Sequence, residues 1–194
     1  MIVCVAGKND ISVNVLQTLF EKKDKNYELG IICNQNETGK DSWQKSLRFY
    51  ARKCGIREYT LQEIYQMKEL VFFSMEFDQI LKPERFIDAR FYNIHFSLLP
   101  KYRGMYTSAL PILYGEKQSG VTLHRIDRGI DTGDIIAQKV IEIGEEDTSR
   151  DLYLECIEKG TQLVIEYMDV LLKGTESAIP QEKLGATYFG RNAI

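Results

Sequence analysis

Asn93 and His95 are the first two residues whose types and spacing suggest chemistry. They lie in the apolar segment 91–96, FYNIHF, which we expect to form a β-strand. Because residues two apart on a strand point to the same side, an amide and an imidazole would project together near the strand's carboxyl end. An amide can donate a hydrogen bond to a developing oxyanion, and an imidazole can exchange a proton near neutral pH. The spacing alone fits equally well a strand-end histidine bonded to a carbonyl group.

A loop rich in acids and glycines, IDRGIDTGD, follows at 126–134 between two expected strands. It contains Asp127, Gly129, Asp131, Gly133 and Asp134. Such a loop is either a surface turn or the support for a carboxylate that faces His95. A calcium site is disfavoured because the ligand pattern of a calcium loop, with its terminal Glu, is absent, and we expect no metal. The second histidine, His124, precedes this loop, and we expect it behind or beside the site in a structural role.

Two further segments carry candidate ligand-binding residues. The turn after the first expected strand, AGKNDIS, holds Lys8 and Asn9, where a cation near a helix N-terminus could bind a phosphate. This turn lacks the GxGxxG pattern of dinucleotide-binding loops, and a simple turn fits it as well. The segment SLLPKYRG at 97–104 contains a proline and a glycine that would shape a turn and place Arg103 at the rim of a cleft.

The sequence predicts alternating strands and helices around these residues. Apolar runs predict strands at 2–6, 28–33, 70–77, 91–96, 120–126 and 134–143. Helices are expected after Asn9 or Asp10 as the N-cap, near 47–54 and 107–114, and from a capping box at Thr148 and Asp151 to Gly174. The alternation favours an α/β fold with a mostly parallel sheet and helices on both faces, in which ligands bind beyond the carboxyl ends of the strands.

Length and composition favour one globular domain. The chain has 194 residues, of which 44% are apolar and 27% charged, and we expect a catalytic domain over 1–174 followed by a C-terminal arm over 175–194. We expect this arm to be either truncated or involved in oligomerisation. The net charge of −3 predicts no nucleic acid partner, and the lack of a long apolar run predicts no membrane span. Four scattered cysteines predict reduced thiols in the cytoplasm rather than a zinc site.

The block NIHFSLLPKYRG followed by GVTLHRIDRGIDTGDIIAQ resembles the signature of the folate-dependent formyltransferases. The resemblance implies the Rossmann-like fold of that family, 10-formyltetrahydrofolate as co-substrate, and Asn93, His95 and Asp131 as the catalytic set. In these roles Asn93 and His95 would donate hydrogen bonds to the oxyanion that forms on the formyl oxygen. Asp131 would orient the imidazole and help to take the proton of the attacking amine.

The segments SMEFDQILKPERF and YRGMYTSALPILYGE resemble one branch of this family, the enzymes that formylate dTDP-linked amino sugars of lipopolysaccharide O-antigen biosynthesis. This branch implies an acceptor such as dTDP-4-amino-4,6-dideoxyglucose or a close isomer, with the amine at carbon 3 or 4, and a homodimer. The resemblance implies folate contacts from Met75, Glu76, Phe77, Ile80, Leu81, Asp127, Gly129 and Ile130. Contacts to the nucleotide sugar are expected from Lys8, Asn9, Arg103 and Tyr106. The alternatives are a methionyl-tRNA or glycinamide ribonucleotide formyltransferase, or a nucleotide-binding module without catalysis.

Overall fold

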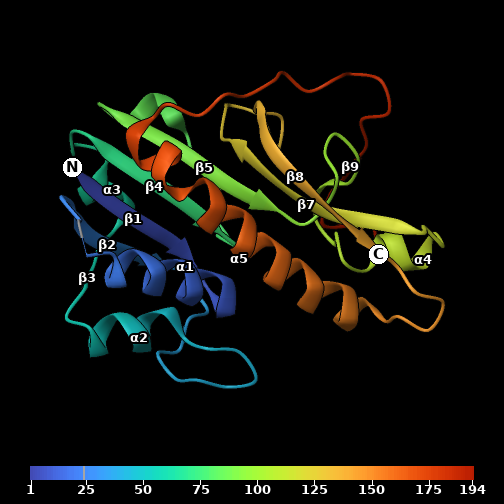
Figure 1. Ribbon diagram of the computed structural model, residues 1–194, viewed down its shortest axis with the longest axis horizontal. Coiled ribbons are helices and arrows are strands. Elements are labelled where there is room, and N and C mark those ends of the chain that lie inside the picture. The colour runs from blue at the N-terminus through green and yellow to red at the C-terminus, as the bar shows by residue number, and fades with distance from the viewer. Residues whose placement is uncertain (24) are drawn as a thin grey trace. The chain divides into compact units, whose positions relative to one another are not determined.

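The computed structural model describes residues 1–23 and 25–194 (Figure 1). The chain divides into two compact units, Met1–Tyr92 and Asn93–Ile194. Strand β5 (Ala89–His95) runs through the boundary between the two units. The expected catalytic domain over 1–174 and the arm over 175–194 stay predictions.

The first unit is built on parallel strands. Its elements are β1 (Ile2–Gly7), α1 (Asn9–Glu21), β2 (Glu28–Cys33), α2 (Leu47–Lys53), β3 (Arg57–Glu58), α3 (Leu61–Ile64), β4 (Leu70–Met75) and the short helix η1 (Pro83–Arg85). β1 pairs in parallel with both β2 and β4, and β2 pairs in parallel with β3. Every residue of β4 is buried, as expected of a parallel strand covered on both faces.

The second unit contains the end of β5 and an antiparallel pair of long strands. Its other elements are β6 (Arg103–Gly104), α4 (Leu110–Leu113), β7 (Gln118–Arg125), β8 (Ile135–Glu142), α5 (Ser149–Lys173) and β9 (Tyr188–Phe189). β7 and β8 are antiparallel, and α5 packs against both (Figure 1). The strand order β3-β2-β1-β4-β5-β7-β8 confirms the predicted α/β fold with a mostly parallel sheet.

The helices follow from their apolar spacing and end signals. Ile11, Val15, Leu16 and Leu19 are fully buried on one face of α1, as their spacing predicts. The predicted capping box of α5 is also present, since Thr148 accepts from the backbone of Asp151 and the Asp151 carboxylate accepts from the backbone of Thr148. Gly174 ends α5 in the left-handed conformation, with φ of 67°.

The predicted cap of α1 is wrong. The helix begins after Lys8, which makes no side-chain capping bond. The Asp10 carboxylate instead accepts from the backbone N–H of Lys45, and the Asn9 amide donates to Glu76. Tertiary partners have therefore replaced the local cap at this end of the helix.

The carboxyl ends of β1 and β4 approach each other closely. The backbone N–H of Lys8 donates to the Met75 carbonyl oxygen at 3.3 Å. A Cβ atom on Gly7 would lie only 1.7 Å from that oxygen, and Gly7 has φ of 143°. Glycine is therefore required at the last position of β1. The sequence predicted β4 to extend to residue 77, but the strand ends at Met75 because Glu76 adopts a left-handed φ of 57°.

Candidate active site

Strand β5 presents both of the first candidates, Asn93 and His95. Asn93 is half-buried, and His95 is only 7% exposed. Their alternation on the strand sends both side chains toward one polar cluster in the second unit. The cluster is completed by His124 from β7 and by Asp131 from the β7–β8 loop.

The two ring nitrogens of His95 have different partners. Its Nε2 lies 2.7 Å from the carbonyl oxygen of Tyr102. A carbonyl can only accept, so Nε2 must carry a hydrogen and donate it. Its Nδ1 faces the Asp131 carboxylate, 3.5 Å from Oδ2. Nδ1 is therefore the atom of His95 that can exchange a proton or donate a hydrogen bond within the cluster.

Asp131 is held in an uncommon conformation. Its φ of 53° is left-handed, which costs a residue other than glycine about 1–2 kcal/mol. Its Oδ2 accepts a hydrogen bond from the backbone N–H of Gly104 at 2.8 Å. Non-glycine residues in sparsely populated backbone regions cluster at functional sites. The loop thus directs a carboxylate at His95, which is the second of the two possibilities that the sequence left open.

His124 belongs to the cluster and is not merely behind it. Its Nδ1 lies 2.7 Å from the carbonyl oxygen of Arg125 and must donate, which leaves Nε2 as an acceptor. Asn93 Nδ2 donates to that Nε2 at 3.0 Å. Burial lowers the pKa of His124 to about 4, although the Asp131 carboxylate opposes the shift. A neutral His124 therefore fixes the orientation of the Asn93 amide.

The expected folate contacts in the first unit follow the end of β4. Met75 is fully buried, Leu81 is 7% exposed, and Ile80 is 69% exposed. Glu76 accepts a hydrogen bond from Asn9 through its side chain and from Asn34 through its carbonyl oxygen. The ring of Phe77 packs edge-on against Phe72. The structure thus gives Met75 and Leu81 core positions and leaves the Ile80 side chain available to a ligand.

The expected folate contacts in the second unit lie in the β7–β8 loop. Asp127 accepts from the backbone N–H of Gly129 and from the hydroxyl of Thr132, so its carboxylate organises the loop itself. Ile130, next to Asp131, is 39% exposed. An exposed apolar side chain beside a catalytic candidate is suited to contact an aromatic ring system.

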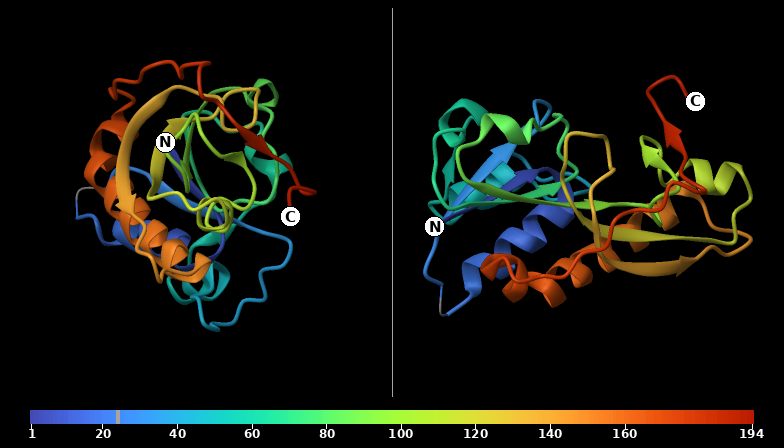
Figure 2. Two further views of the ribbon diagram at one scale, coloured as in Figure 1. Left: turned by 90° about the vertical axis from the view of Figure 1, so that its right-hand side faces the viewer. Right: turned by 90° about the horizontal axis from the view of Figure 1, so that it is seen from above.

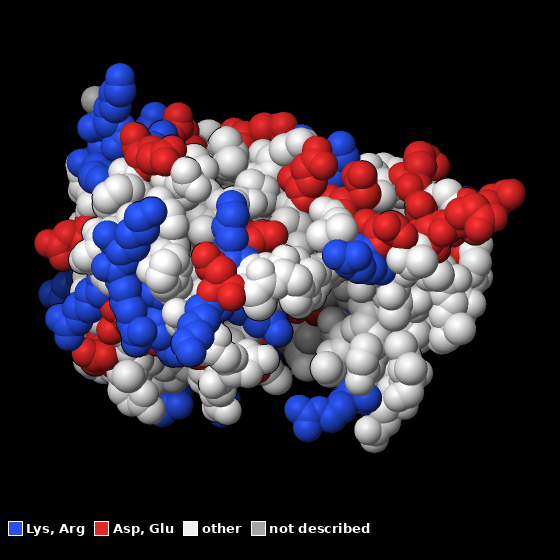
Figure 3. Space-filling model, turned by 90° about the horizontal axis from the view of Figure 1, so that it is seen from below, with Lys and Arg blue, Asp and Glu red and all other residues white. Residues whose placement is uncertain are grey.

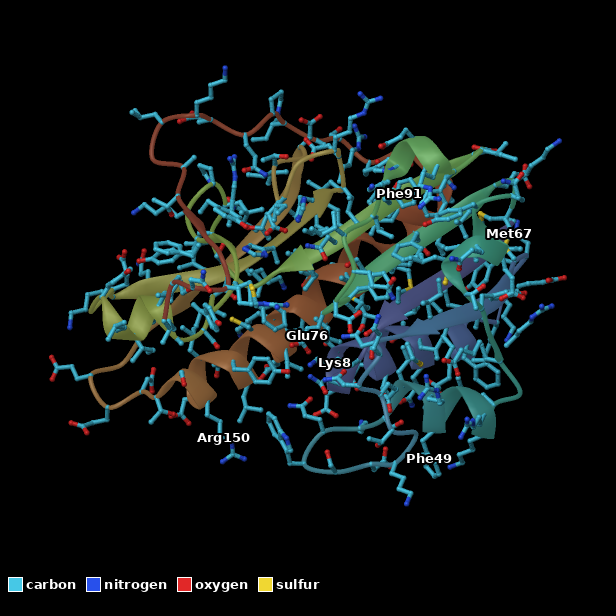
Figure 4. All side chains as sticks on the ribbon, turned by 180° about the vertical axis from the view of Figure 1, so that it is seen from behind. Lys8, Phe49, Met67, Glu76, Phe91 and Arg150 are labelled. Atoms are coloured by element: carbon cyan, nitrogen blue, oxygen red, sulfur yellow. The ribbon has the colours of Figure 1, made fainter. Side chains whose placement is uncertain are left out.

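The expected acceptor contacts have protein partners. Lys8 lies at the carboxyl end of β1 in the first unit, at the same end as Glu76 (Figure 4). In the second unit, the Arg103 guanidinium donates to the side-chain oxygen of Gln181, and the Tyr106 hydroxyl donates to the Arg191 carbonyl. Sequence reasoning missed Gln181 because nothing in the tail marked it.

Within residues 1–23 and 25–194, no group of three or more His, Cys, Asp or Glu side chains is arranged to hold a metal ion. Within those same residues, no helix has the length and apolarity to cross a bilayer. Figure 3 shows acidic side chains gathered at the end of the second unit where β8 leads into α5, a connection that contains Glu145, Glu146 and Asp147.

The chain matches the family model described as formyl transferase over residues 2–168. The chain belongs to the formyl transferase family. The match includes β5, β7 and the β7–β8 loop, which together carry the polar cluster. The predicted family is therefore confirmed.

Members of this family with known structures or names are similar over nearly the whole chain. WlaRD, a sugar 3N-formyltransferase solved with dTDP and 5-N-formyl-THF, is 44% identical with a TM-score of 0.96, and the match covers 100% of this chain and 71% of that one. An N-formyltransferase from Helicobacter canadensis, solved with folinic acid and dTDP-3-aminofucose, is 44% identical with a TM-score of 0.96, covering 100% and 72%. Methionyl-tRNA formyltransferase from Kosmotoga olearia is 30% identical over 94% of this chain, and the chain spans 62% of that relative's length.

Proposed function

We propose that this chain transfers a formyl group from 10-formyltetrahydrofolate to the primary amine of a dTDP-linked amino-dideoxy sugar. The observation that carries the proposal is the convergence of Asn93, His95 and Asp131 in a member of the formyl transferase family. Formyl transfer needs a donor for the developing oxyanion and a group that accepts the amine's proton. The cluster contains both kinds of group.

The geometry suggests a role for each of the three residues. The amine nitrogen attacks the formyl carbon, and the carbonyl oxygen gains negative charge. One hydrogen of Asn93 Nδ2 is bonded to His124, and its second hydrogen together with Nδ1–H of a protonated His95 would stabilise that oxygen. The attacking amine gives its proton to Asp131, directly or through a water. The C–N10 bond then breaks, and the proton taken from the amine passes to N10 of the folate, directly or through a water, which leaves Asp131 ionised again.

The proposal also specifies the acceptor sugar. The two structures at 44% identity are a sugar 3N-formyltransferase and an enzyme solved with dTDP-3-aminofucose. They favour a 3-amino sugar over the 4-amino-4,6-dideoxyglucose that the sequence suggested. Within this proposal, Lys8, Asn9, Arg103 and Tyr106 contact the nucleotide sugar. The folate contacts are Met75, Glu76, Phe77, Ile80, Leu81, Asp127, Gly129 and Ile130.

Location and assembly complete the proposal. We infer a cytoplasmic homodimer that uses no nucleic acid partner. The four cysteines are all free, as expected in a reducing compartment. The acidic end of the second unit would repel a polynucleotide backbone. Light scattering of the purified protein tests the dimer, and a monomeric mass at micromolar concentration would contradict it.

A panel of acceptors tests the function. The chain is incubated with 10-formyltetrahydrofolate and, separately, dTDP-3-amino and dTDP-4-amino dideoxy sugars, glycinamide ribonucleotide and methionyl-tRNA. Mass spectrometry should show a gain of one formyl group on a dTDP-amino sugar, fastest with a 3-amine. Formylation of methionyl-tRNA or glycinamide ribonucleotide in preference to every sugar would assign the chain to another branch. No transfer to any acceptor would favour the nucleotide-binding module.

A further inference from the structure

The segment after α5 returns along the second unit in the opposite direction to the helix (Figures 1 and 2). It pairs with β8 through a bridge between Ile179 and Ile135, and its strand β9 pairs in parallel with β6. The sequence predicted an arm that is truncated or used for oligomerisation. In the structure this tail, residues 175–194, is bonded to the loop that carries Asp131 and to strand β6.

Gln181 makes the most direct of these contacts. Its Nε2 donates to the carbonyl oxygen of Asp131 at 2.9 Å and to that of Gly133 at 2.7 Å. Its Oε1 accepts from Nη2 of Arg103 at 2.6 Å and from Nε at 3.2 Å. Carbonyl groups only accept and a guanidinium only donates, so these four bonds fix the orientation of the amide. One side chain thus joins Arg103 to the backbone of the Asp131 loop.

The Asp131 loop is a segment whose conformation needs such support. Asp131 has a left-handed φ of 53°, and the buried Gly133 packs so tightly that a Cβ atom would lie 1.9 Å from the Arg125 carbonyl oxygen. Uncommon backbone conformations of this kind persist only when the surrounding structure holds them in place. The bonds from Gln181 act on the two carbonyls on either side of Thr132, directly after the carboxylate-bearing residue.

The tail also supports the Asp131 carboxylate through β6. The backbone N–H of Gly104 donates to Asp131 Oδ2. The N–H groups on either side of it, at Arg103 and Met105, donate to the tail carbonyls of Thr187 and Phe189 at 2.9 and 2.8 Å. The tail therefore positions strand β6, and β6 in turn binds the Asp131 carboxylate.

A third contact lies at the start of the same loop. The Arg125 guanidinium donates to Oε1 of Glu176 from Nε at 3.0 Å and from Nη2 at 2.8 Å. The Glu176 side chain is only 4% exposed. Because the carbonyl of Arg125 accepts from His124, this ion pair anchors the residue that fixes the His124 ring. The tail thus contacts both ends of the β7–β8 loop.

We propose that Gln181 is a positioning residue for the formyl transfer reaction, which holds the backbone of Asp131 and Gly133 so that the Asp131 carboxylate faces His95. The proposal rests on the proposed function for its catalytic consequence. Its structural consequence, the geometry between Asp131 and Gly104, can be measured in the protein without any substrate.

Two substitutions of Gln181 distinguish the role of its amide nitrogen, the donor, from that of its amide oxygen, the acceptor. Gln181→Met keeps the length of the side chain and removes all four hydrogen bonds. Gln181→Glu keeps the acceptor for Arg103 but removes the donor to the two carbonyls. Gln118, whose amide donates to Glu142 on an exposed part of β7, supplies matched controls as Gln118→Met and Gln118→Glu. Thermal unfolding of all four variants checks that each is folded.

We expect both Gln181 variants to lose between about tenfold and 100-fold in kcat, because small displacements of a catalytic group are costly. In Gln181→Glu, which keeps the acceptor for Arg103, KM for the nucleotide sugar should change by less than about threefold, since Asp131 acts in the reaction rather than in binding. Loss in Gln181→Met with full activity in Gln181→Glu would assign the effect to Arg103 and overturn the proposal. Activity within twofold of the parent in both variants would also overturn it.

The Gly104 amide supplies a readout that does not depend on turnover. In the parent protein its NMR signal should show slow hydrogen exchange with solvent, because the N–H donates to Asp131 Oδ2. In Gln181→Met this exchange should accelerate. An unchanged Gly104 signal in a folded variant contradicts the proposal even if the parent proves to be inactive. An inactive parent by itself contradicts only the proposed function.

Discussion

The two histidines of this chain have different hydrogen-bond partners, and these partners give the two rings different chemical roles. His95 donates from Nε2 to a backbone carbonyl and turns Nδ1 toward Asp131. His124 donates from Nδ1 to a backbone carbonyl and turns Nε2 toward the amide of Asn93. Burial lowers the pKa of His124 and keeps its ring neutral. One imidazole is thus suited to proton exchange and the other to orienting an amide.

The first prediction at the residue scale concerns the three proposed catalytic residues. Asn93→Ala, His95→Ala and Asp131→Ala should each fold and lose most turnover. Loss of one oxyanion donor typically costs about 2.7–4 kcal/mol, or roughly 100- to 1000-fold in kcat. Steady-state kinetics on the acceptor that the panel selects measures the loss, and circular dichroism checks the fold. Near-parental turnover in His95→Ala would remove the mechanism.

The second prediction concerns the pH dependence of stability that His124 causes. Its folded-state pKa of about 4 lies below the ordinary value of 6.5, so between these values the unfolded chain binds a proton that the folded chain does not. Stability should therefore rise with pH across this window, by roughly 3 kcal/mol from His124 alone. Urea unfolding at pH 4.5 and pH 7 should show a smaller difference in His124→Gln than in the parent. Equal differences in the two proteins would refute the shift.

At the element scale, the contact between β1 and β4 depends on a single missing side chain. The strands pair in register along six residues and end together at Gly7 and Met75. At this point the carbonyl oxygen of Met75 occupies the space where a Cβ atom of residue 7 would lie. The close approach places Lys8 and Glu76 beside each other at the strand ends (Figure 4).

Gly7→Ala should consequently destabilise the protein severely. The new methyl group would lie 1.7 Å from a backbone oxygen, which must move together with its strand. We expect a loss of about 3 kcal/mol or more in the free energy of unfolding. Gly55→Ala is the matched control, because Gly55 has φ of 68° but nothing within 4 Å of the added atom. Its cost should stay near 1–2 kcal/mol, and equal losses in urea unfolding would show that steric overlap at Gly7 is unimportant.

At the scale of the whole molecule, ligand binding should increase the thermal stability of the protein. A ligand that binds only the folded chain raises the free energy of unfolding by about 2.7 kcal/mol at 100 times its Kd. We therefore expect 5-formyltetrahydrofolate to raise the Tm, in proportion to the logarithm of its concentration. p-Aminobenzoylglutamate, which lacks the pterin, should shift the Tm much less. No shift with 5-formyltetrahydrofolate at millimolar concentration would contradict a folate site on this chain.

The sequence by itself determined most elements of the fold, because their signals are local. Strand β2 matches the apolar run at 28–33, and the capping box of α5 needs only residues that are three apart. Strand alternation likewise predicts that Asn93 and His95 point to the same side of their strand. Short elements escaped this reasoning, since β3, β6 and β9 have two residues each and show no periodicity.

Only the tertiary structure decided which distant groups meet. The register of β7 against β8 shifts between Leu123 and His124, and strand alternation cannot predict such an irregularity. Gln181 contacts groups that lie 48 to 78 residues away in the sequence. Such contacts depend on the course of the whole chain rather than on spacing between neighbours. The sequence therefore supplied the chemical groups, and the folded chain determined how they are held.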